Sequence, residues 1–308
     1  NPIPIPIVID IDNTNYVNSP PTITAPPVLN IEGCAENDIT ALTARYPYSS
    51  VESADIKDTY VSAGYTVSSD AAITSITYID AMTPGSTCPL EITRTYTATN
   101  SCGYTGTAIQ IINVVDTISP TIDTSAINNT VECDGAGNIS ALNTWVNSNG
   151  GAIASDNCSA VIWSHIVDSV VNVCGSTNVL TYTFTATDAC GNESTTTASF
   201  TIEDTTAPIV PSAPADTTYE CITDIPTAVN LTATDNCAGD IIATGIDSID
   251  NSDPCNIVIT RTWTFTDSCN NSSSVSQLIT INPSTPPVVP ADGSSTVDCI
   301  AGAIQPAA

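Results

Sequence analysis

Cysteine residues recur along the chain at a nearly constant interval, and this recurrence constrains the fold more than any other feature. One series is separated by 99, 88 and 78 residues and consists of Cys34, Cys133, Cys221 and Cys299. A second series is separated by 88 and 79 residues and consists of Cys102, Cys190 and Cys269. Repeats of this length are whole domains, because the units of solenoid proteins are shorter.

The intervals divide the 308 residues into tandem domains. We predict an N-terminal extended arm, or the end of a preceding repeat, followed by three complete repeats and the start of a fourth. The predicted boundaries are 1–21, 22–118, 119–206, 207–285 and 286–308. The joints between repeats are short and contain proline, so we expect them to hold the domains in a semi-rigid array.

Polar and apolar residues alternate within each repeat, which is typical of half-buried strands. In repeat three the segment 260–265 places Arg261, Trp263 and Phe265 on one face and threonines on the other. The equivalent positions of the other repeats are Tyr182, Phe184 and Ala186, and Arg94, Tyr96 and Ala98. Only residues 139–146 have a helical pattern. We therefore predict an all-β fold of tandem immunoglobulin-like β-sandwich domains in an extended rod.

The chain is strongly acidic, with 32 Asp and Glu residues against 4 Lys and Arg residues and a formal net charge of -28. Such a surface repels nucleic acid and anionic lipid, so we expect neither nucleic-acid binding nor membrane insertion. It attracts divalent cations instead. No segment approaches the roughly 20 apolar residues of a membrane helix. No signal peptide is visible, and we interpret the chain as a mature product or a piece of a longer one.

The 12 cysteines indicate an oxidising compartment, and hence an extracellular or cell-surface location. A zinc site needs Cys or His residues clustered at short spacing. The chain has no Cys-x-x-Cys pair and a single histidine, His165. Disulfides are therefore the predicted state of the cysteines.

The pairing is predicted from repeat three, where Cys255 and Cys269 bracket one long strand. About ten strand residues span roughly 33 Å, whereas the Cα atoms of bridged cysteines lie within about 7 Å. In a sandwich with termini at opposite ends, Cys221 and Cys255 meet at the far end, and Cys237 and Cys269 meet at the near end. The predicted bridges are Cys34–Cys88, Cys133–Cys174, Cys158–Cys190, Cys221–Cys255 and Cys237–Cys269. The alternative pairs the first cysteine with the second and the third with the fourth, because sequence alone does not fix connectivity.

Repeat one departs from this pattern, because Ser69–Ala72 stands where repeat two has its Asp-Asn-Cys turn. Cys102 and Cys299 are consequently left unpaired. We interpret Cys102 as a buried free thiol and Cys299 as part of an incomplete fourth repeat. Bridges from these two residues to neighbouring chains are the alternative.

The turns carry a recognisable pattern: Asp156–Cys158, then Asp188–Asn192, then Asp204–Pro208. This pattern resembles the hyalin-repeat (HYR) family of immunoglobulin-like modules, and most of all the repeats of SprB-like, type IX secreted cell-surface adhesins of Bacteroidota. The resemblance covers nearly all of residues 22–308. It is strong in repeat two, good in repeat three and weaker in repeat one. It implies an extracellular stalk or filament without catalysis of its own.

The same resemblance implies O-glycosylation at Asp-Ser or Asp-Thr sequences followed by a small or aliphatic residue. The residues that fit are Thr117, Ser169, Thr205, Thr217 and Ser248.

Calcium is the only candidate cofactor. Near-end turns should lie beside the preceding linker, and hard cations favour several carboxylate and carbonyl oxygens. The predicted ligands are Asp116 with Asp156 and Asp188 at one joint, and Glu203 and Asp204 with Asp235 and Asp267 at the next. The alternative is that these carboxylates only cap the backbone amides of their own turns.

No residue pattern indicates catalysis. His165 lies in a predicted strand without a nucleophile motif around it. Arg94 and Arg261 are expected in structural ion pairs, and Trp145, Trp163 and Trp263 in the core. We therefore predict a non-enzymatic stalk or filament segment of a secreted bacterial cell-surface adhesin. Its expected partners are other repeats of the same chain, other copies of itself, or surface glycans.

Two alternative functions remain open. In one, a repeat binds a glycan or protein directly, although aromatic residues make up only 5% of the chain. In the other, the chain is a fibre subunit, and the proline-rich arm at residues 1–12 completes the sheet edge of a neighbour by strand addition.

Overall fold

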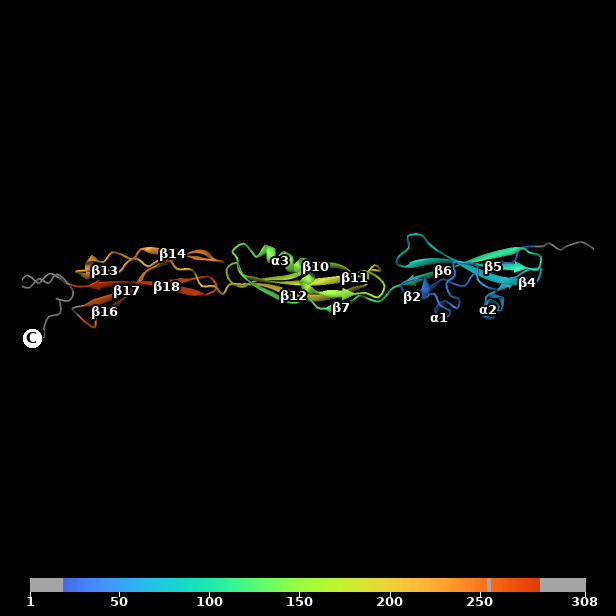
Figure 1. Ribbon diagram of the computed structural model, residues 1–308, viewed down its shortest axis with the longest axis horizontal. Coiled ribbons are helices and arrows are strands. Elements are labelled where there is room, and N and C mark those ends of the chain that lie inside the picture. The colour runs from blue at the N-terminus through green and yellow to red at the C-terminus, as the bar shows by residue number, and fades with distance from the viewer. Residues whose placement is uncertain (1–18, 254–255, 283–308) are drawn as a thin grey trace, which may run out of the picture. The chain divides into compact units, whose positions relative to one another are not determined.

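The computed structural model describes residues 19–253 and 256–282, and its chain is built mainly from strands (Figure 1). The predicted all-β fold is confirmed, since the described residues form immunoglobulin-like β-sandwiches in tandem. Helices are few and short, and none in the described part of the chain is long and apolar enough to cross a membrane.

Repeat one contains a four-stranded sheet in the order β2-β6-β5-β4 and a two-stranded sheet of β1 and β3. Its strands are β1 (Thr22–Ile23), β2 (Leu29–Glu32), β3 (Val67–Ser68), β4 (Ile73–Met82), β5 (Leu90–Asn100) and β6 (Thr105–Val115). The connections contain η1 (Glu36–Asp38), α1 (Ala41–Ala44) and α2 (Lys57–Ser62).

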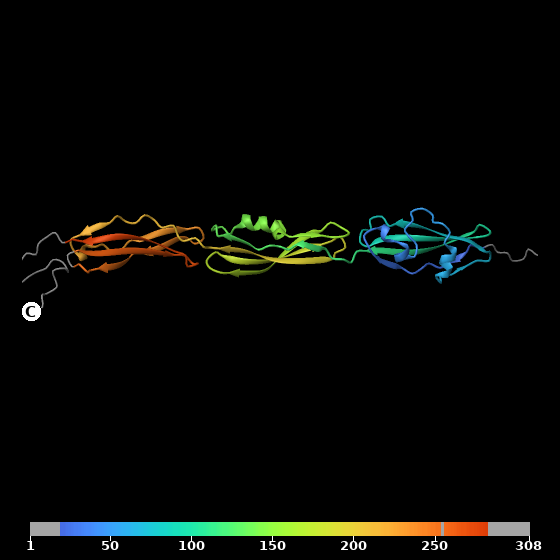
Figure 2. The ribbon, with the colours of Figure 1, turned by 60° about the horizontal axis from the view of Figure 1, so that its bottom comes forward.

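Repeat two has the same plan, with sheets β10-β11-β12-β8 and β7-β9. Its strands are β7 (Thr121–Thr124), β8 (Asn129–Glu132), β9 (Ile153–Ser155), β10 (Ile162–Asn172), β11 (Asn178–Thr187) and β12 (Glu193–Glu203). Helix α3 (Ile139–Asn147), visible in Figure 2, confirms the one helical pattern of the sequence, and η2 (Asn149–Gly151) follows it.

Repeat three has sheets β13-β18-β17-β16 and β14-β15. Its strands are β13 (Thr217–Tyr219), β14 (Asn230–Asp235), β15 (Gly239–Thr244), β16 (Ile246–Asp250), β17 (Ile257–Thr266) and β18 (Ser272–Ile281). A short helix, η3 (Ile222–Asp224), follows the first strand.

The first strand of the large sheet pairs in parallel with the last strand in all three repeats. In repeat one β2 lies beside β6, with Glu32 opposite Val115, and in repeat two β8 lies beside β12, with Glu132 opposite Glu203. The ladder continues one residue further in both repeats, where the Gly33 N–H donates to the Val115 carbonyl at 3.2 Å and the Cys133 N–H donates to the Glu203 carbonyl at 2.8 Å. This pairing therefore holds the cysteine that follows the first strand next to the start of the linker.

The alternation in the sequence becomes alternation in burial. In β5 every second side chain is buried, and Ile92, Arg94, Tyr96 and Ala98 are each at most 1% exposed. In β17 the buried face carries Trp263 and Phe265, both 0% exposed, which pack against Ala233. Burial of a large apolar side chain contributes about 1.5–3 kcal/mol, so these central strands hold each sandwich together.

The two predicted arginine ion pairs are confirmed. Arg94 donates to both carboxylate oxygens of Asp80, at 2.7 and 2.8 Å, and its guanidinium lies 4.4 Å from the ring centroid of Tyr78. Arg261 makes the same bidentate contact with Asp247, at 2.7 and 2.9 Å. The bond to Arg261 lowers the pKa of Asp247. Repeat two has Tyr182 at the arginine position.

The tryptophan prediction is only partly right. Trp145 packs its ring 5.4 Å from Phe184 and 5.6 Å from Phe200, measured between centroids, and Trp263 is fully buried. Trp163 is only half-buried. It lies on β10, which is an edge strand of its sheet, so fewer neighbours cover it.

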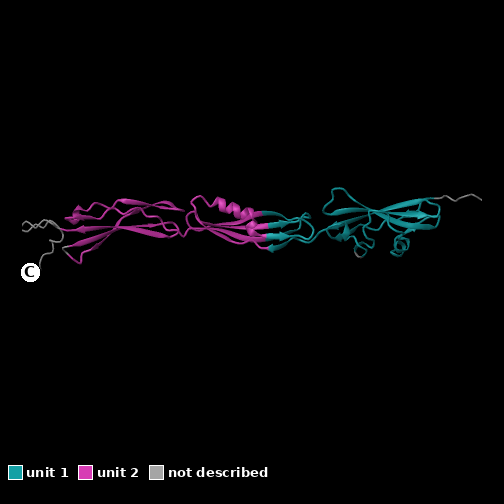
Figure 3. Ribbon diagram, viewed as in Figure 1, with its two compact units in different colours: residues 1–123, 153–164, 185–195 teal, residues 124–152, 165–184, 196–308 magenta. Residues whose placement is uncertain are grey.

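The chain clusters into two compact units whose boundary does not follow the repeats (Figure 3). One unit contains residues 1–123 together with residues 153–164 and 185–195 of repeat two. The other contains residues 124–152, 165–184 and 196–308. Each unit therefore contains one junction between repeats, including the turns on both sides of it.

Candidate functional site at the repeat junctions

The described residues form no catalytic constellation around the single histidine. His165 lies in β10, and its ring packs 6.0 Å from Tyr182 and 6.2 Å from Phe184, measured between centroids. Among the described residues its ring makes no hydrogen bond to a carboxylate or hydroxyl group. The residue types that carry ligand chemistry gather instead at the two junctions.

Each junction begins with a glutamate at the end of the first strand. Glu132 accepts hydrogen bonds from the Thr205 N–H at 3.0 Å, the Thr205 hydroxyl at 2.9 Å and the Thr206 hydroxyl at 2.6 Å. These bonds lower its pKa to about 2, with the Thr206 hydroxyl as the largest cause. In the first junction Glu32 accepts from the N–H and hydroxyl groups of Thr117 in the same way. The glutamate therefore fixes the start of the linker.

The linker aspartate is buried directly after that contact. Asp116 is 3% exposed and Asp204 is 7% exposed. Each uses one carboxylate oxygen, Oδ1, to accept a backbone N–H two residues further along, from Ile118 at 3.1 Å and from Thr206 at 3.3 Å.

A second aspartate comes from the Asp-Asn-Cys turn of the following repeat. Asp156 Oδ1 accepts the N–H groups of Cys158 at 2.9 Å and Ser159 at 2.8 Å. Asp235 Oδ1 makes the equivalent bonds to Cys237 at 2.9 Å and Ala238 at 2.7 Å.

A third aspartate comes from the turn between the last two strands. Asp188 Oδ1 accepts the N–H groups of Cys190 and Asn192, both at 2.8 Å. The Asn192 side chain donates from Nδ2 to Asp188 Oδ2 at 2.7 Å and to the Asp116 carbonyl at 2.9 Å. It thus ties the turn of repeat two to the linker before it.

The second junction repeats this arrangement bond for bond. Asp267 Oδ1 accepts the N–H groups of Cys269 at 2.7 Å and Asn271 at 2.9 Å. Asn271 Nδ2 donates to Asp267 Oδ2 at 2.9 Å and to the Asp204 carbonyl at 3.0 Å. The prediction of metal ligands did not include the two asparagines, although the shared Asp-x-Cys-x-Asn spacing of repeats two and three could have identified them.

Five of the seven predicted calcium ligands are therefore brought together, in two groups. Ligand oxygens of Asp116, Asp156 and Asp188 lie within 4.8 Å of one another, as do those of Asp204 and Asp267. Glu203 is exposed, and neither its carboxylate nor that of Asp235 is part of the second group.

The capping bonds leave four carboxylate oxygens unused. The Oδ2 atoms of Asp116, Asp156, Asp204 and Asp235 are buried and have no hydrogen-bond partner. Burial raises the pKa of Asp116, the Ile118 N–H opposes this shift, and the charges of Asp156 and Asp188 add to it. Burial likewise raises the pKa of Asp204, and the neighbouring charge of Asp235 raises it further. In Asp188 the hydrogen bonds from Asn192 and the turn N–H groups outweigh burial, so the pKa is lowered.

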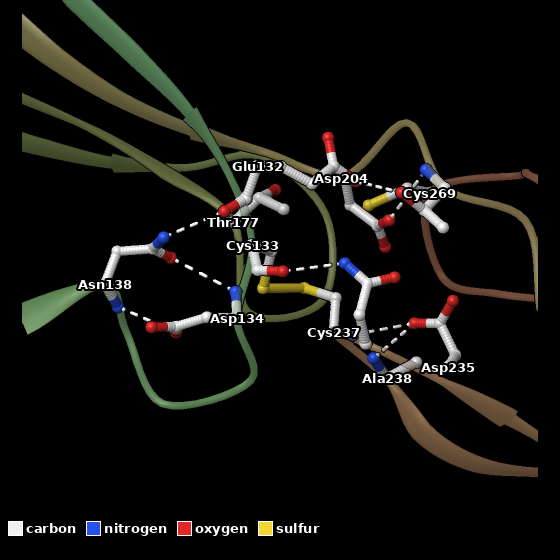
Figure 4. Close-up of a disulfide and its surroundings, with 12 residues drawn as sticks. Glu132, Cys133, Asp134, Asn138, Thr177, Asp204, Asp235, Cys237, Ala238 and Cys269 are labelled. Carbon is white, nitrogen blue, oxygen red and sulfur yellow. Dashed lines mark hydrogen bonds between the residues drawn. A yellow bond between two sulfur atoms is a disulfide. The ribbon is translucent and has the colours of Figure 1, made fainter. Parts of the chain in front are cut away.

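Two disulfides cross each junction, and the predicted pairing within repeats is wrong for the four bridges that the described residues test. The observed bridges are Cys34–Cys158, Cys88–Cys190, Cys133–Cys237 and Cys174–Cys269, with Cα–Cα distances of 4.9–5.4 Å. They replace the predicted Cys34–Cys88, Cys133–Cys174, Cys158–Cys190 and Cys237–Cys269. Figure 4 shows the Cys133–Cys237 bridge between the Asp134 loop and the Asp235 turn, with Asp204 and Cys269 nearby.

The predicted pairing was wrong because it considered each repeat alone and omitted the repeat that follows it. Cys34 and Cys88 do lie at the far end of repeat one, but that end faces the turns of repeat two that carry Cys158 and Cys190. A signal was present in the sequence, because repeat one lacks one near-end cysteine and has no partner for the other. In the observed bridges each near-end cysteine of repeats two and three pairs with a far-end cysteine of the repeat before it.

The predictions for the remaining cysteines are partly tested by the described residues. Cys102 is free, as predicted, but it is exposed and not buried. It lies at the tip of the turn between β5 and β6. Cys221 is disulfide-bonded. Cys255 and Cys299 lie outside the described residues, so the Cys221–Cys255 bridge and the unpaired state of Cys299 stay predictions.

The predicted glycosylation residues are spread over all three repeats. Thr117, Ser169, Thr205 and Ser248 are exposed, and Thr217 is half-buried. The hydroxyl groups of Thr117 and Thr205 donate to Glu32 and Glu132 at the junctions. Modification at any of these residues stays a prediction.

Comparison with protein families finds a match for one of the repeats. Residues 209–281 match the model of an HYR-like domain with four cysteines, which covers most of repeat three and well under half of the chain. No curated protein is significantly similar to the chain in sequence.

Solved structures with a similar fold include cadherin ectodomains. Drosophila N-cadherin EC1-4 is 11% identical, with 86% of this chain and 76% of that chain covered and a TM-score of 0.27. Human CDH23 EC21-23 is 12% identical, with 85% of this chain and 100% of that chain covered and a TM-score of 0.26. At these scores the likeness carries no argument about function.

Proposed function

We propose that the chain is a non-enzymatic segment of an extracellular adhesion structure, in which consecutive repeats are cross-linked so that each junction bears tension through covalent bonds. The finer form of the proposal is a stalk or filament segment of a secreted bacterial cell-surface adhesin. The HYR-like match of residues 209–281 and four disulfides in the described residues support an adhesion-type module in an oxidising, extracellular environment.

The observation that carries the proposal is the order of the bridges along the chain. Each one joins residues 95–124 positions apart, and successive loops overlap. The shortest covalent path from Cys34 to Cys269 therefore crosses to Cys158, follows the chain only to Cys174 and crosses again. A pulling force along the chain loads this short path even after the sandwiches have unfolded.

Single-molecule force spectroscopy with handles at the two chain ends tests the proposal. In the oxidised protein the part between Cys34 and Cys269 should lengthen to roughly 50–60 Å of extended chain. After reduction the same part should lengthen to roughly 800 Å. Equal extension before and after reduction would contradict the proposal.

Matched cysteine variants locate the effect. The double substitution Cys174→Ser and Cys269→Ser should lengthen the oxidised protein, because the path must then follow a longer stretch of chain. Cys102→Ser is the control, since Cys102 forms no bridge, and it should leave the extension unchanged. Peptide mapping without reduction should independently recover Cys34 linked to Cys158.

A self-assembling fibre subunit is the second candidate, and one observation favours it. Strand β10 lies at the edge of its sheet and exposes Ile166 by 63% and Val170 by 56%. An apolar edge strand is a template for pairing with another chain. The predicted arm at residues 1–12 lies outside the described residues. Electron microscopy tests this candidate: filaments that disappear when β10 carries Ile166→Lys and Val170→Lys support it, and a monodisperse protein contradicts it.

A further inference from the structure

We propose that each junction binds a divalent cation, calcium, through three aspartates: Asp116, Asp156 and Asp188 in the first junction, and Asp204, Asp235 and Asp267 in the second. The mechanical role and the cation site are tested separately, because the first depends on the disulfide connectivity and the second on the carboxylates.

The carboxylates converge on one place in each junction. In the first, the three aspartates contribute ligand atoms that all lie within 4.8 Å of one another. Asp116 also lines a small recess together with Cys34, Cys158 and Cys190 of the two disulfides of that junction. In the second, Asp204 and Asp267 meet at the same spacing beside Cys269. The Cys269 sulfur is in a bridge, so oxygen atoms are the donors that remain.

Buried oxygens without partners are the second, independent observation. Capping of turns accounts for the Oδ1 atoms, each of which accepts backbone N–H groups. It does not account for the Oδ2 atoms of Asp116, Asp156, Asp204 and Asp235, which are buried and unpartnered. A buried polar atom without a partner costs free energy, and a bound ion is one of the explanations for such an atom in a native structure.

The charge balance points to a cation as the missing partner. Three carboxylates meet within 4.8 Å in the first junction and two in the second. No ion pair of the described residues reaches them, because Arg94 and Arg261 are bonded to Asp80 and Asp247. The available donors are carboxylate oxygens, which hard cations prefer, whereas zinc favours nitrogen and sulfur. Calcium accepts irregular sets of six to eight oxygens, including water, while magnesium demands near-ideal octahedral geometry. Irregular turns from three segments suit calcium.

The experiment is a calorimetric titration of the oxidised full chain, stripped with a chelator, with calcium chloride and separately with magnesium chloride. We expect one calcium per junction with a dissociation constant of about 10⁻⁴–10⁻³ M, the range of extracellular modules, and weaker magnesium binding. A rise in melting temperature with calcium that the chelator reverses should accompany it. No calcium heat and no shift at millimolar calcium would overturn the proposal.

Two variants assign the sites. Asp188→Asn should remove the first site and Asp267→Asn the second, each leaving one calcium per chain. Asparagine retains an Oδ1 acceptor, and Asn100 already holds the equivalent turn of repeat one by accepting the Cys102 and Tyr104 N–H groups, so both variants should fold. Asp123→Asn and Asp240→Asn are the controls, because they remove the same charge from exposed positions. Two calcium ions retained by Asp188→Asn, or loss of binding in the controls, would overturn the assignment.

Discussion

The same turn occurs at the near end of repeat one and of repeat two, with different chemistry. In repeat two, Asp188 Oδ1 accepts the N–H groups of Cys190 and Asn192, both at 2.8 Å. In repeat one, Asn100 Oδ1 accepts the N–H groups of Cys102 and Tyr104 at 3.1 and 3.0 Å. The backbone fold of the turn therefore needs an oxygen acceptor but not a negative charge.

The difference between the two turns shows what the junction adds. Asn100 uses its amide to donate to Ser69 Oγ at 3.2 Å and to the Ser19 carbonyl at 3.4 Å. Asp188 is instead surrounded by other carboxylates, and Cys190 is bridged where Cys102 is free. The aspartate charge and the disulfide are thus features of the contact between repeats. The hydrogen-bonded turn itself forms within each repeat without them.

The two turns should differ most in how much their cysteines contribute to the stability of the protein. Replacing both Cys88 and Cys190 with serine opens a loop of 102 residues, and loss of a bridge of this kind costs about 2–4 kcal/mol. Cys102→Ser should change stability by less than about 0.5 kcal/mol, as is usual for an exposed residue. Thermal unfolding of the two variants beside the parent protein measures both values. Equal effects would mean that the Cys88–Cys190 bridge contributes nothing to stability.

Asn100→Asp in repeat one should destabilise the protein more than Asp188→Asn in repeat two. Asn100→Asp removes two donated hydrogen bonds from a side chain that is 3% exposed and puts a charge near two acceptors, at a cost of about 1–3 kcal/mol. Asp188→Asn loses a charge-assisted bond but also a like-charge contact, so its net effect without cations should be smaller. Chemical denaturation in the presence of a chelator checks the ranking. A larger loss for Asp188→Asn would show that its charge is structural.

A smaller effect of opposite sign is expected at the linker. The folded state raises the pKa of Asp116, first through burial and also through the charges of Asp156 and Asp188. Folding therefore disfavours this charge, and Asp116→Asn should slightly stabilise the cation-free protein at neutral pH. Asp123→Asn, an exposed acid seven positions away, should have no measurable effect. Destabilisation by Asp116→Asn in chelator would mean that its unpartnered oxygen has a favourable contact.

The fold was predictable because its determinants are local and repeated. Threonine alternates with Tyr96 and Ala98 in one repeat and with Trp263 and Phe265 in another, and period-two patterning fixes which face of a strand is buried. The acids of the junction were predictable for the same reason, since Asp156, Asp188 and Asp204 recur with their turns.

The disulfide connectivity was not predictable from one repeat considered alone. Cys34 and Cys158 are 124 residues apart, and their contact depends on how the end of one sandwich meets the next. No local pattern contains that information. The exposure of Cys102 was missed for a related reason, because burial of a turn cysteine depends on contacts from outside its own repeat.

The smallest effect on stability is expected at Cys102, but its thiol reactivity should differ most clearly from that of Cys190. Cys102 is an exposed free thiol in a turn whose counterpart in repeat two places Cys190 in a bridge. A thiol-specific maleimide should therefore modify the peptide carrying Cys102 in the native protein without changing its melting temperature. The peptide carrying Cys190 should react only after reduction, which supplies the internal control. If Cys102 resists the reagent until a reductant is added, a second chain has bonded to it, and the near end of repeat one then forms a cross-linked junction as well.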